Sequence, residues 1–262
     1  MKYLILLKMY WQNSWVYPVS FMMWRFRQFI STFAAITVWV AIFQTQQSAF
    51  GYSRDSMISY IFLTGFLQSM ILATQTGGLA QQIYAGEISN TLLKPLNIFG
   101  AFIVQEISDK FLNFSFVIIE TIILIQIFHP VFILPPLPLF LLFLIAVILG
   151  AVLLFFMMLL LGTLGFWSPD TWGPRFLFYI FVDFTAGKLF PLNIFPKILQ
   201  DILALTPFPY LTYAQTQIFL QHSSSDQILK TFLLLGFWII VIATAFSLIW
   251  RKGIKDYGAA GH

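Results

Sequence analysis

Few residues in this sequence have the types and the spacing that catalysis requires. The one Gly-Lys pair, Gly187-Lys188, lacks a glycine five residues earlier and a Ser or Thr after it, so it is not a phosphate-binding loop. His129, His222 and His262 lie far apart and form no HExxH pattern, and the chain has neither a G-x-S-x-G element nor a cysteine. We therefore expect no catalytic site, metal site or cofactor on this chain.

Polar residues inside long apolar stretches are better candidates for function. Two sets recur every seven residues, so each set occupies one helical face that should avoid lipid. Such residues either join helices by hydrogen bonds or line a path or an interface. An acidic side chain inside a membrane span costs free energy unless it has a polar or charged partner or is hydrated. Glu120 is accordingly either a partner for a hydroxyl or amide or part of a cation-attracting pathway. The two sets are Gln68, Gln75 and Gln82, and Glu106, Asn113 and Glu120.

The composition shows where these residues must lie. Hydrophobic residues make up 59% of the chain and charged residues 9%, whereas a soluble domain carries about 25% charged residues. The apolar runs are too long and too continuous for barrel strands, so we predict an all-α polytopic membrane protein. A net charge of +4 without a basic cluster does not indicate nucleic-acid binding. The uncharged runs are 28–53, 56–86, 121–169 and 231–250.

Six transmembrane helices account for these runs. The fifth is short and contains Asp183, which could pair with Lys188 near the outer boundary in a structural role. No remaining piece is large enough for a separate soluble domain, so residues 1–262 form a single transmembrane domain. The predicted spans are 28–45, 57–76, 107–128, 138–166, 175–190 and 229–250.

Two segments outside the spans should also meet the membrane. Residues 1–27 interleave basic residues with Trp and Tyr and contain no acid, which favours a helix in the headgroup layer. Residues 191–210 place four prolines around an apolar stretch too short to cross alone. That pattern indicates a re-entrant or interfacial hairpin between the last two spans.

The basic residues set the orientation. With a cytoplasmic amino terminus, ten Lys and Arg residues fall on inside segments and four on outside segments. This distribution satisfies the positive-inside rule, and the inverse topology would violate it. Both termini are therefore expected in the cytoplasm.

The segment between the second and third predicted spans has the most informative sequence. Residues 86–97 read Gly-Glu-Ile-Ser-Asn-Thr-Leu-Leu-Lys-Pro-Leu-Asn. This stretch resembles the G-E-I-S-x-x-L-L-x-P-L element of ABC-2 type permeases, the membrane subunits of ATP-binding-cassette exporters. Residues 189–210, which begin Leu-Phe-Pro-Leu-Asn-Ile-Phe-Pro, and residues 250–261 are similar to the short six-helix branch of the same family.

The resemblance implies roles for three segments. In that family, an amino-terminal interfacial helix and the loop after the second span contact a separate nucleotide-binding subunit, and an outer re-entrant hairpin precedes the last span. These roles fall on residues 1–27, 81–97 and 191–210. The residues expected to dock the ATPase are Gly86, Glu87, Ile88, Ser89, Asn90 and Leu93.

The implied function is export by an ATP-driven transporter. This chain would be its permease subunit in a bacterial inner membrane, moving a drug-like, lipid or glycan substrate out of the cytoplasm or inner leaflet. ATP and Mg²⁺ would bind the partner ATPase, and a second permease copy or paralogue would complete the path, with Gln68, Gln75, Asn113 and Glu120 as candidate path or interface residues. Two alternatives remain: a proton-driven transporter with Glu120 as proton carrier, and a membrane scaffold without transport.

Overall fold

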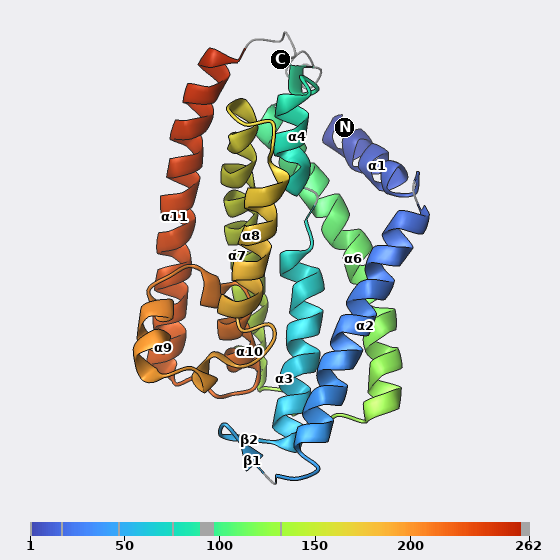
Figure 1. Ribbon diagram of the computed structural model, residues 1–262, viewed down its shortest axis with the longest axis vertical. Helices are drawn as coiled ribbons and strands as arrows, with labels where there is room; N and C mark the ends of the chain where they lie inside the picture. The colour runs from blue at the N-terminus through green and yellow to red at the C-terminus, as the bar shows by residue number, and fades with distance from the viewer. Residues whose placement is uncertain are drawn as a thin grey trace.

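The computed structural model describes residues 2–16, 18–46, 48–74, 76–89, 97–131 and 133–257, which are almost entirely helical (Figure 1). In these residues the one sheet is a hairpin of β1 (Ser48–Ala49) and β2 (Tyr52–Ser53). The longer helices are α1 (Lys2–Ser14), α2 (Pro18–Ile42), α3 (Arg54–Leu67), α6 (Ile98–Phe128), α7 (Leu137–Gly162), α8 (Trp172–Thr185) and α11 (Ser225–Asp256). The shorter ones are η1 (Gln68–Leu72), η2 (Thr76–Gly78), α4 (Leu79–Tyr84), η3 (Thr163–Phe166), η4 (Leu192–Ile194), α9 (Lys197–Ala204), η5 (Phe208–Tyr210) and α10 (Tyr213–Phe219).

Four helical segments in the described part of the chain are long and apolar enough to cross a membrane. They coincide with the second, third, fourth and sixth predicted spans, so the prediction of an all-α, multi-pass membrane protein is confirmed. The four segments are Arg54–Leu72, Ile98–Phe128, Leu137–Phe166 and Ser225–Lys255.

The predicted count of six spans is not confirmed, because α2 and α8 are not among these four segments. Helix α2 contains the first predicted span as far as Ile42, but its first part also holds Arg25 and Arg27. Helix α8 has 14 residues and is about 21 Å long, which is less than the ~30 Å of the hydrocarbon core.

The predicted amino-terminal helix over residues 1–27 is two helices in the structure. Helix α1 ends at Ser14, and α2 begins at Pro18. Proline suits the first turn of a helix, where its missing N–H is not needed, so Pro18 marks a natural start. Arg25 and Arg27 therefore belong to α2 and not to the segment expected in the headgroup layer.

The second predicted span is interrupted. Helix α3 runs into η1, a π-helical turn closed by a 3.0 Å hydrogen bond from the Ala73 amide to the Gln68 carbonyl. Ala73 is extended, with ψ of 122°, so the predicted helix over 57–76 ends at Leu72. The expected common face of the three glutamines fails for this reason: Gln82 lies in the separate helix α4, and Gln75 lies outside the described residues.

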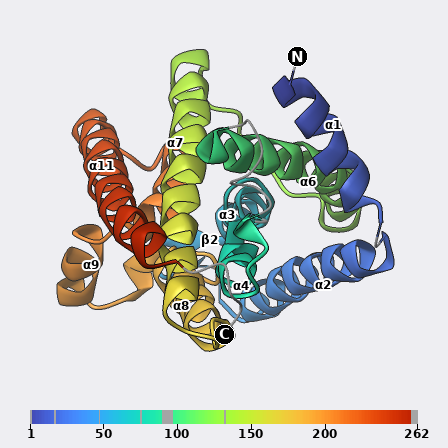
Figure 2. The same ribbon diagram turned by 90° about the horizontal axis from the view of Figure 1, so that it is seen from above.

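Helices α3 and α4 lie one above the other in the middle of the molecule, between α2, α6, α7 and α8 (Figure 2). Close approach of α4 to the end of α7 and to η3 depends on two glycines, which have no side chain. A Cβ atom on Gly165 would lie 2.2 Å from the Ala80 carbonyl oxygen, and one on Gly162 would lie 2.8 Å from the Leu79 side chain. Helix α4 is thus packed closely against the end of α7 and against η3.

The two ends of the bundle differ. Helix α1, helix α4 and the carboxyl end of α11 lie at one end, and the β-hairpin, α9 and α10 lie at the other (Figure 1). The segment expected to dock an ATPase follows α4 and begins at the first of these ends.

Candidate functional site

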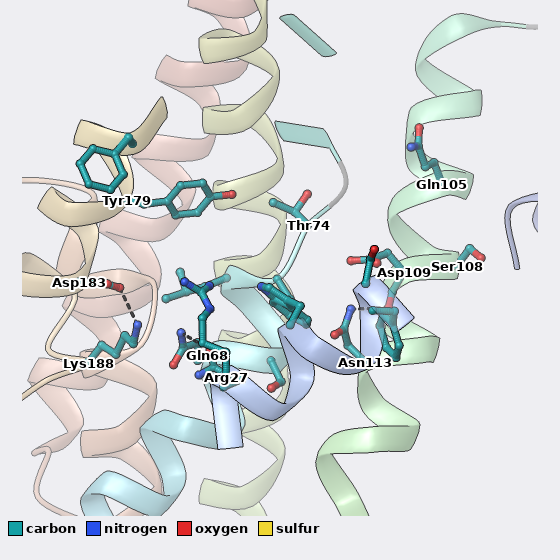
Figure 3. A pocket seen from close by; sticks show the side chains of 18 of the residues that line it. Arg27, Gln68, Thr74, Gln105, Ser108, Asp109, Asn113, Tyr179, Asp183 and Lys188 are labelled. Atoms are coloured by element: carbon teal, nitrogen blue, oxygen red, sulfur yellow. Dashed lines mark hydrogen bonds and ion pairs between the residues drawn. The ribbon is translucent and has the colours of Figure 1, made fainter. Parts of the chain in front are cut away.

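A cavity of about 690 Å³ lies beside the interruption of the second span (Figure 3). Its walls come from α1, α2, η1 and the segment that follows, α6, and α8 with the turn after it. Most wall side chains are amides, hydroxyls or aromatic rings, and the charged ones are Arg27, Asp109, Asp183 and Lys188. Spaces between helices are usual places for ligand sites, and this one is polar at the depth of the spanning segments.

Arg25 is the residue that organises the helices around the cavity. Its side chain is 4% exposed, and it donates two hydrogen bonds to Glu120: Nε to Oε1 at 2.8 Å and Nη2 to Oε2 at 2.5 Å. Its Nη1 donates to Ser69 Oγ at 3.0 Å and to Asn113 Oδ1 at 3.3 Å. One guanidinium therefore joins α2 to η1 and to two positions on α6. Such bidentate, charge-assisted pairs are among the strong hydrogen-bonding arrangements of carboxylates.

Glu120 has a charged partner in the structure, Arg25, which is neither the hydroxyl nor the amide considered from the sequence. This pair was not predicted, because Arg25 was assigned to the inside segment before the first span. Pro18 could have predicted it, because proline favours the first turn of a helix, and a helix that begins at Pro18 includes Arg25.

A second polar cluster holds the interruption itself. Lys110 Nζ donates to the carbonyl oxygens of Ile71, at 2.9 Å, and Ala73, and it pairs with Glu106 at 3.0 Å. Thr74 Oγ1 and Thr76 Oγ1 donate to Glu106 Oε2 at 2.6 and 2.9 Å. The interruption leaves backbone carbonyls and threonine hydroxyls without helical hydrogen bonds. Lys110 and Glu106 on α6 supply their partners. Unsatisfied polar backbone groups within the membrane would cost free energy.

The predicted polar face of α6 is confirmed. Glu106 and Asn113 are 8% and 1% exposed, and the Glu120 side chain is 17% exposed. Asp109 lies on the same face, four residues before Asn113, and is 4% exposed. Asp109 was not among the residues predicted for this face, although spacings of three and four residues from Glu106 and Asn113 place it there.

The predicted path residues are only partly brought together. Gln68 and Asn113 both line the cavity, and Gln68 Nε2 donates to Gln28 Oε1 at 3.0 Å. Glu120 binds Arg25 and is not part of the cavity wall. Gln75 lies outside the described residues.

The predicted pair on and after α8 is present. Lys188 Nζ donates to Asp183 Oδ1 at 2.9 Å, and both side chains line the cavity (Figure 3). Tyr179, one turn before Asp183, also reaches this wall. Helix α8 therefore contributes polar groups to the site, even though it is short for a span.

The predicted docking segment is described only as far as Ser89. Gly86 adopts the left-handed conformation, with φ of +78°, and Glu87 after it is exposed. Ile88 is 2% exposed and packs in an apolar cluster with Phe246 and Trp250 of α11. Asn90 and Leu93 lie outside the described residues. Glu87 is thus presented outward on a turn whose next residue is anchored in the core.

Comparison with known families supplies a further finding. A family model described as ABC-2 family transporter protein matches residues 29–261, which is most of the chain. The match begins after α1 and after Arg25 and Arg27. No curated protein matches the sequence.

Proposed function

The chain belongs to the ABC-2 family of membrane transporters, and from this premise we propose that it is the permease subunit of an ATP-driven exporter. ATP would bind and be hydrolysed, with Mg²⁺, on separate ATPase subunits. A second permease, identical or paralogous, would complete the complex in a bacterial inner membrane. The substrate would leave the cytoplasm or the inner leaflet through the path that the two permeases form.

The polar cavity carries this proposal. Its wall holds buried Asp109 and Asn113, and the Arg25–Glu120 pair lies beside it. Burying ionisable and amide groups among apolar spanning helices costs free energy, so such groups usually mark a route for a polar or amphipathic substrate. Because Gln68 hydrogen-bonds Gln28 across one chain, a cross-link from position 68 would report on this cavity and not on contact between two copies.

The arrangement of Glu120 favours ATP-driven transport over the proton-driven alternative. Both carboxylate oxygens accept hydrogen bonds from Arg25. A proton carrier must bind and release its proton in each cycle, which would break this bidentate pair every time. Glu120 serves better as a fixed connection between α2 and α6.

We retain six spans in the proposal, with α2 and α8 as the first and fifth and with both termini cytoplasmic. The excess of basic residues on the inner segments supports this orientation. So does the position of α1 and the end of α11 at the same end of the bundle (Figure 1). Residues 191–210 would form the outer hairpin. On α9, Ile198 and Ile202 are 77% and 55% exposed, an apolar face suited to the membrane interface.

Cysteine labelling tests this topology. Because the native chain has no cysteine, single cysteines can be introduced at exposed positions without a background. Cysteines replacing Glu87 or Lys252 should react with a membrane-impermeant maleimide only in inverted vesicles. Cysteines replacing Ser53 or Asp226 should react in intact cells. Reaction of position 87 in intact cells would overturn the proposed orientation.

Glu87 provides the test of ATPase docking. Its exposed carboxylate could accept charge-assisted hydrogen bonds from a basic group on the ATPase. Glu87→Ala should weaken ATPase binding about tenfold or more and reduce transport per ATP hydrolysed. Permease stability should change by less than about 0.5 kcal/mol, because the side chain is exposed. Co-purification and ATP-dependent transport in proteoliposomes measure these effects.

The matched control is Asp201→Ala on α9, an exposed acid at the opposite end of the bundle. The two variants should differ in ATPase binding. If they bind the ATPase equally well and transport alike, Glu87 is not a docking residue. Proline at Ile88 is a poorer probe, because the 2% exposed side chain belongs to the apolar core.

A further inference from the structure

One side of the cavity carries a positive charge without a counter-charge. Arg27, Tyr179, Asp183 and Lys188 line this side (Figure 3). Lys188 Nζ donates to Asp183 Oδ1 at 2.9 Å, so these two charges balance each other. Arg27 forms no ion pair or hydrogen bond with any residue in the described part of the chain. The Arg27 guanidinium is therefore the charge in this wall that a ligand could neutralise.

The two carboxylates in the cavity wall have cationic neighbours. Asp183 is paired with Lys188. Asp109, on the opposite side of the cavity, interacts electrostatically with the guanidinium of Arg25. Neither carboxylate thus requires a cationic ligand. The charge pattern of the wall accordingly favours an anionic ligand over a cationic one.

Arg27 lies well within α2. It is nine residues after Pro18, the first residue of α2, which corresponds to about 14 Å along the helix axis. It is also two residues beyond Arg25, whose guanidinium binds side chains of η1 and α6. Charged side chains within spanning segments usually pair with one another or face a water-filled cavity. The Arg27 side chain is exposed and lines the cavity, so a ligand there can reach it.

The uncharged groups available on this side are hydrogen-bond donors. Gln28 is 5% exposed, and its Oε1 accepts from Gln68 Nε2 at 3.0 Å, which leaves Gln28 Nε2 as a buried donor without a partner among the described residues. Gln68 lies on the Arg27 side of the cavity (Figure 3). Within the described chain, the Tyr179 hydroxyl donates only to the Met158 sulfur, a weak acceptor, at 3.7 Å. Buried donors in native proteins are nearly always satisfied, so a ligand with several acceptor atoms fits this side.

We propose that Arg27 and these donors bind a phosphate group of the transported substrate. The inference rests on the proposed transport function and names its class of substrate. A guanidinium can bind two phosphate oxygens at once, and lysine is a common phosphate ligand. A phosphate monoester has three terminal oxygens, enough to accept from Arg27, Lys188 and the uncharged donors together, whereas a carboxylate has two. A neutral or cationic ligand would leave Arg27 without a counter-charge.

Binding of matched amphiphiles tests this preference. The permease, purified in dodecyl maltoside, would carry a fluorophore on a single cysteine at Lys252, which is exposed and outside the cavity, and thermophoresis would measure binding. The probes share one chain length and are added at equal mole fraction in the micelle: dodecyl phosphate, dodecanoate and dodecyltrimethylammonium. We expect dodecyl phosphate to bind about tenfold more tightly than dodecanoate, and the cation to bind more weakly than both.

Glycerol phosphate distinguishes two sources of the phosphate group. If glycerol phosphate displaces dodecyl phosphate, the site takes a soluble phosphorylated compound. If it does not, the site takes a membrane amphiphile such as a lipid phosphate. Both results support the phosphate assignment, because both begin from bound dodecyl phosphate.

Three variants separate the charge of Arg27 from the uncharged donors. Arg27→Gln should weaken dodecyl phosphate binding about tenfold or more without weakening the trimethylammonium probe, and Arg27→Lys should lose less. Tyr179→Phe should weaken dodecyl phosphate binding only about threefold. The matched control is Arg54→Gln, an exposed arginine outside the cavity, which should change nothing. Arg27 is also exposed, so its variants should preserve the fold.

The outcomes separate this inference from the proposed function. Equal or tighter binding of dodecanoate or of the cation would overturn the phosphate assignment. So would absence of dodecyl phosphate binding, or equal dodecyl phosphate affinity in Arg27→Gln and Arg54→Gln. Transport function is judged separately by ATPase binding and ATP-dependent transport, which do not depend on these probes.

Discussion

Arg25→Gln should be among the most damaging single substitutions in this chain. It removes both hydrogen bonds to Glu120 and the donor to Ser69 and Asn113. The carboxylate would remain in a site where the Arg25 and Glu120 side chains are only 4% and 17% exposed. Breaking a buried ion pair by removing one partner costs about 3–5 kcal/mol. Unfolding of the purified permease in detergent should show a loss of this size.

The second half of this experiment replaces both partners. Glu120→Gln alone should also destabilise the permease, whereas the double variant Arg25→Gln, Glu120→Gln should recover part of the loss, because no charge is left unpaired. Arg27→Gln, two residues away and exposed, is the control and should cost less than about 0.5 kcal/mol. A stable Glu120→Gln variant that has lost all transport would instead support Glu120 as a proton carrier.

Lys110→Met should have the next largest effect. The substitution keeps an unbranched side chain but leaves the carbonyls of Ile71 and Ala73 without their donor and Glu106 without its cation. We expect a stability loss of about 3 kcal/mol or more, measured by unfolding in detergent. Any folded fraction should hydrolyse ATP with its ATPase partner but transport poorly, because the interruption lies between α3 and the docking segment.

Three comparison variants separate the effect of the lost charge from that of the lost hydrogen bonds. Lys110→Arg retains a cation and should retain more stability than the methionine variant. Thr76→Val removes one hydrogen bond to Glu106 and should cost only about 1 kcal/mol. Lys230→Met, an exposed position near the start of α11, should be neutral. If Lys110→Met and Lys230→Met have equal stability and transport, Lys110 does not hold the interruption.

The sequence predicted those features that depend on local composition and spacing. Uncharged runs located four spans, and the seven-residue spacing located the buried face of α6 with Glu106 and Asn113. The pairing of Asp183 with Lys188 followed from their closeness in sequence. Each of these depends on neighbours along one segment, which a single sequence contains.

Features that depend on distant partners were not predicted. No proline or glycine lies at residues 67–73, so no local helix-breaking residue predicts that the helix ends at Leu72. The end is stabilised by Lys110, which is 37 residues beyond Ala73. In the same way Arg25 finds Glu120 across 95 residues. Counting basic residues by side of the membrane cannot reveal how deeply one of them enters the bundle.

The ammonium group of Lys110 has a consequence for energy supply. In secondary transporters with broken helices, unwound carbonyls and the carboxyl end of the half-helix coordinate a sodium ion or a proton that arrives from solution. Here two such carbonyls and a carboxylate surround a cation that is covalently attached to α6. The nitrogen of this group cannot leave its site and cross the membrane as a sodium ion does. A sodium gradient therefore has no exchangeable metal ion to act on at this position, which agrees with the proposed coupling to an ATPase.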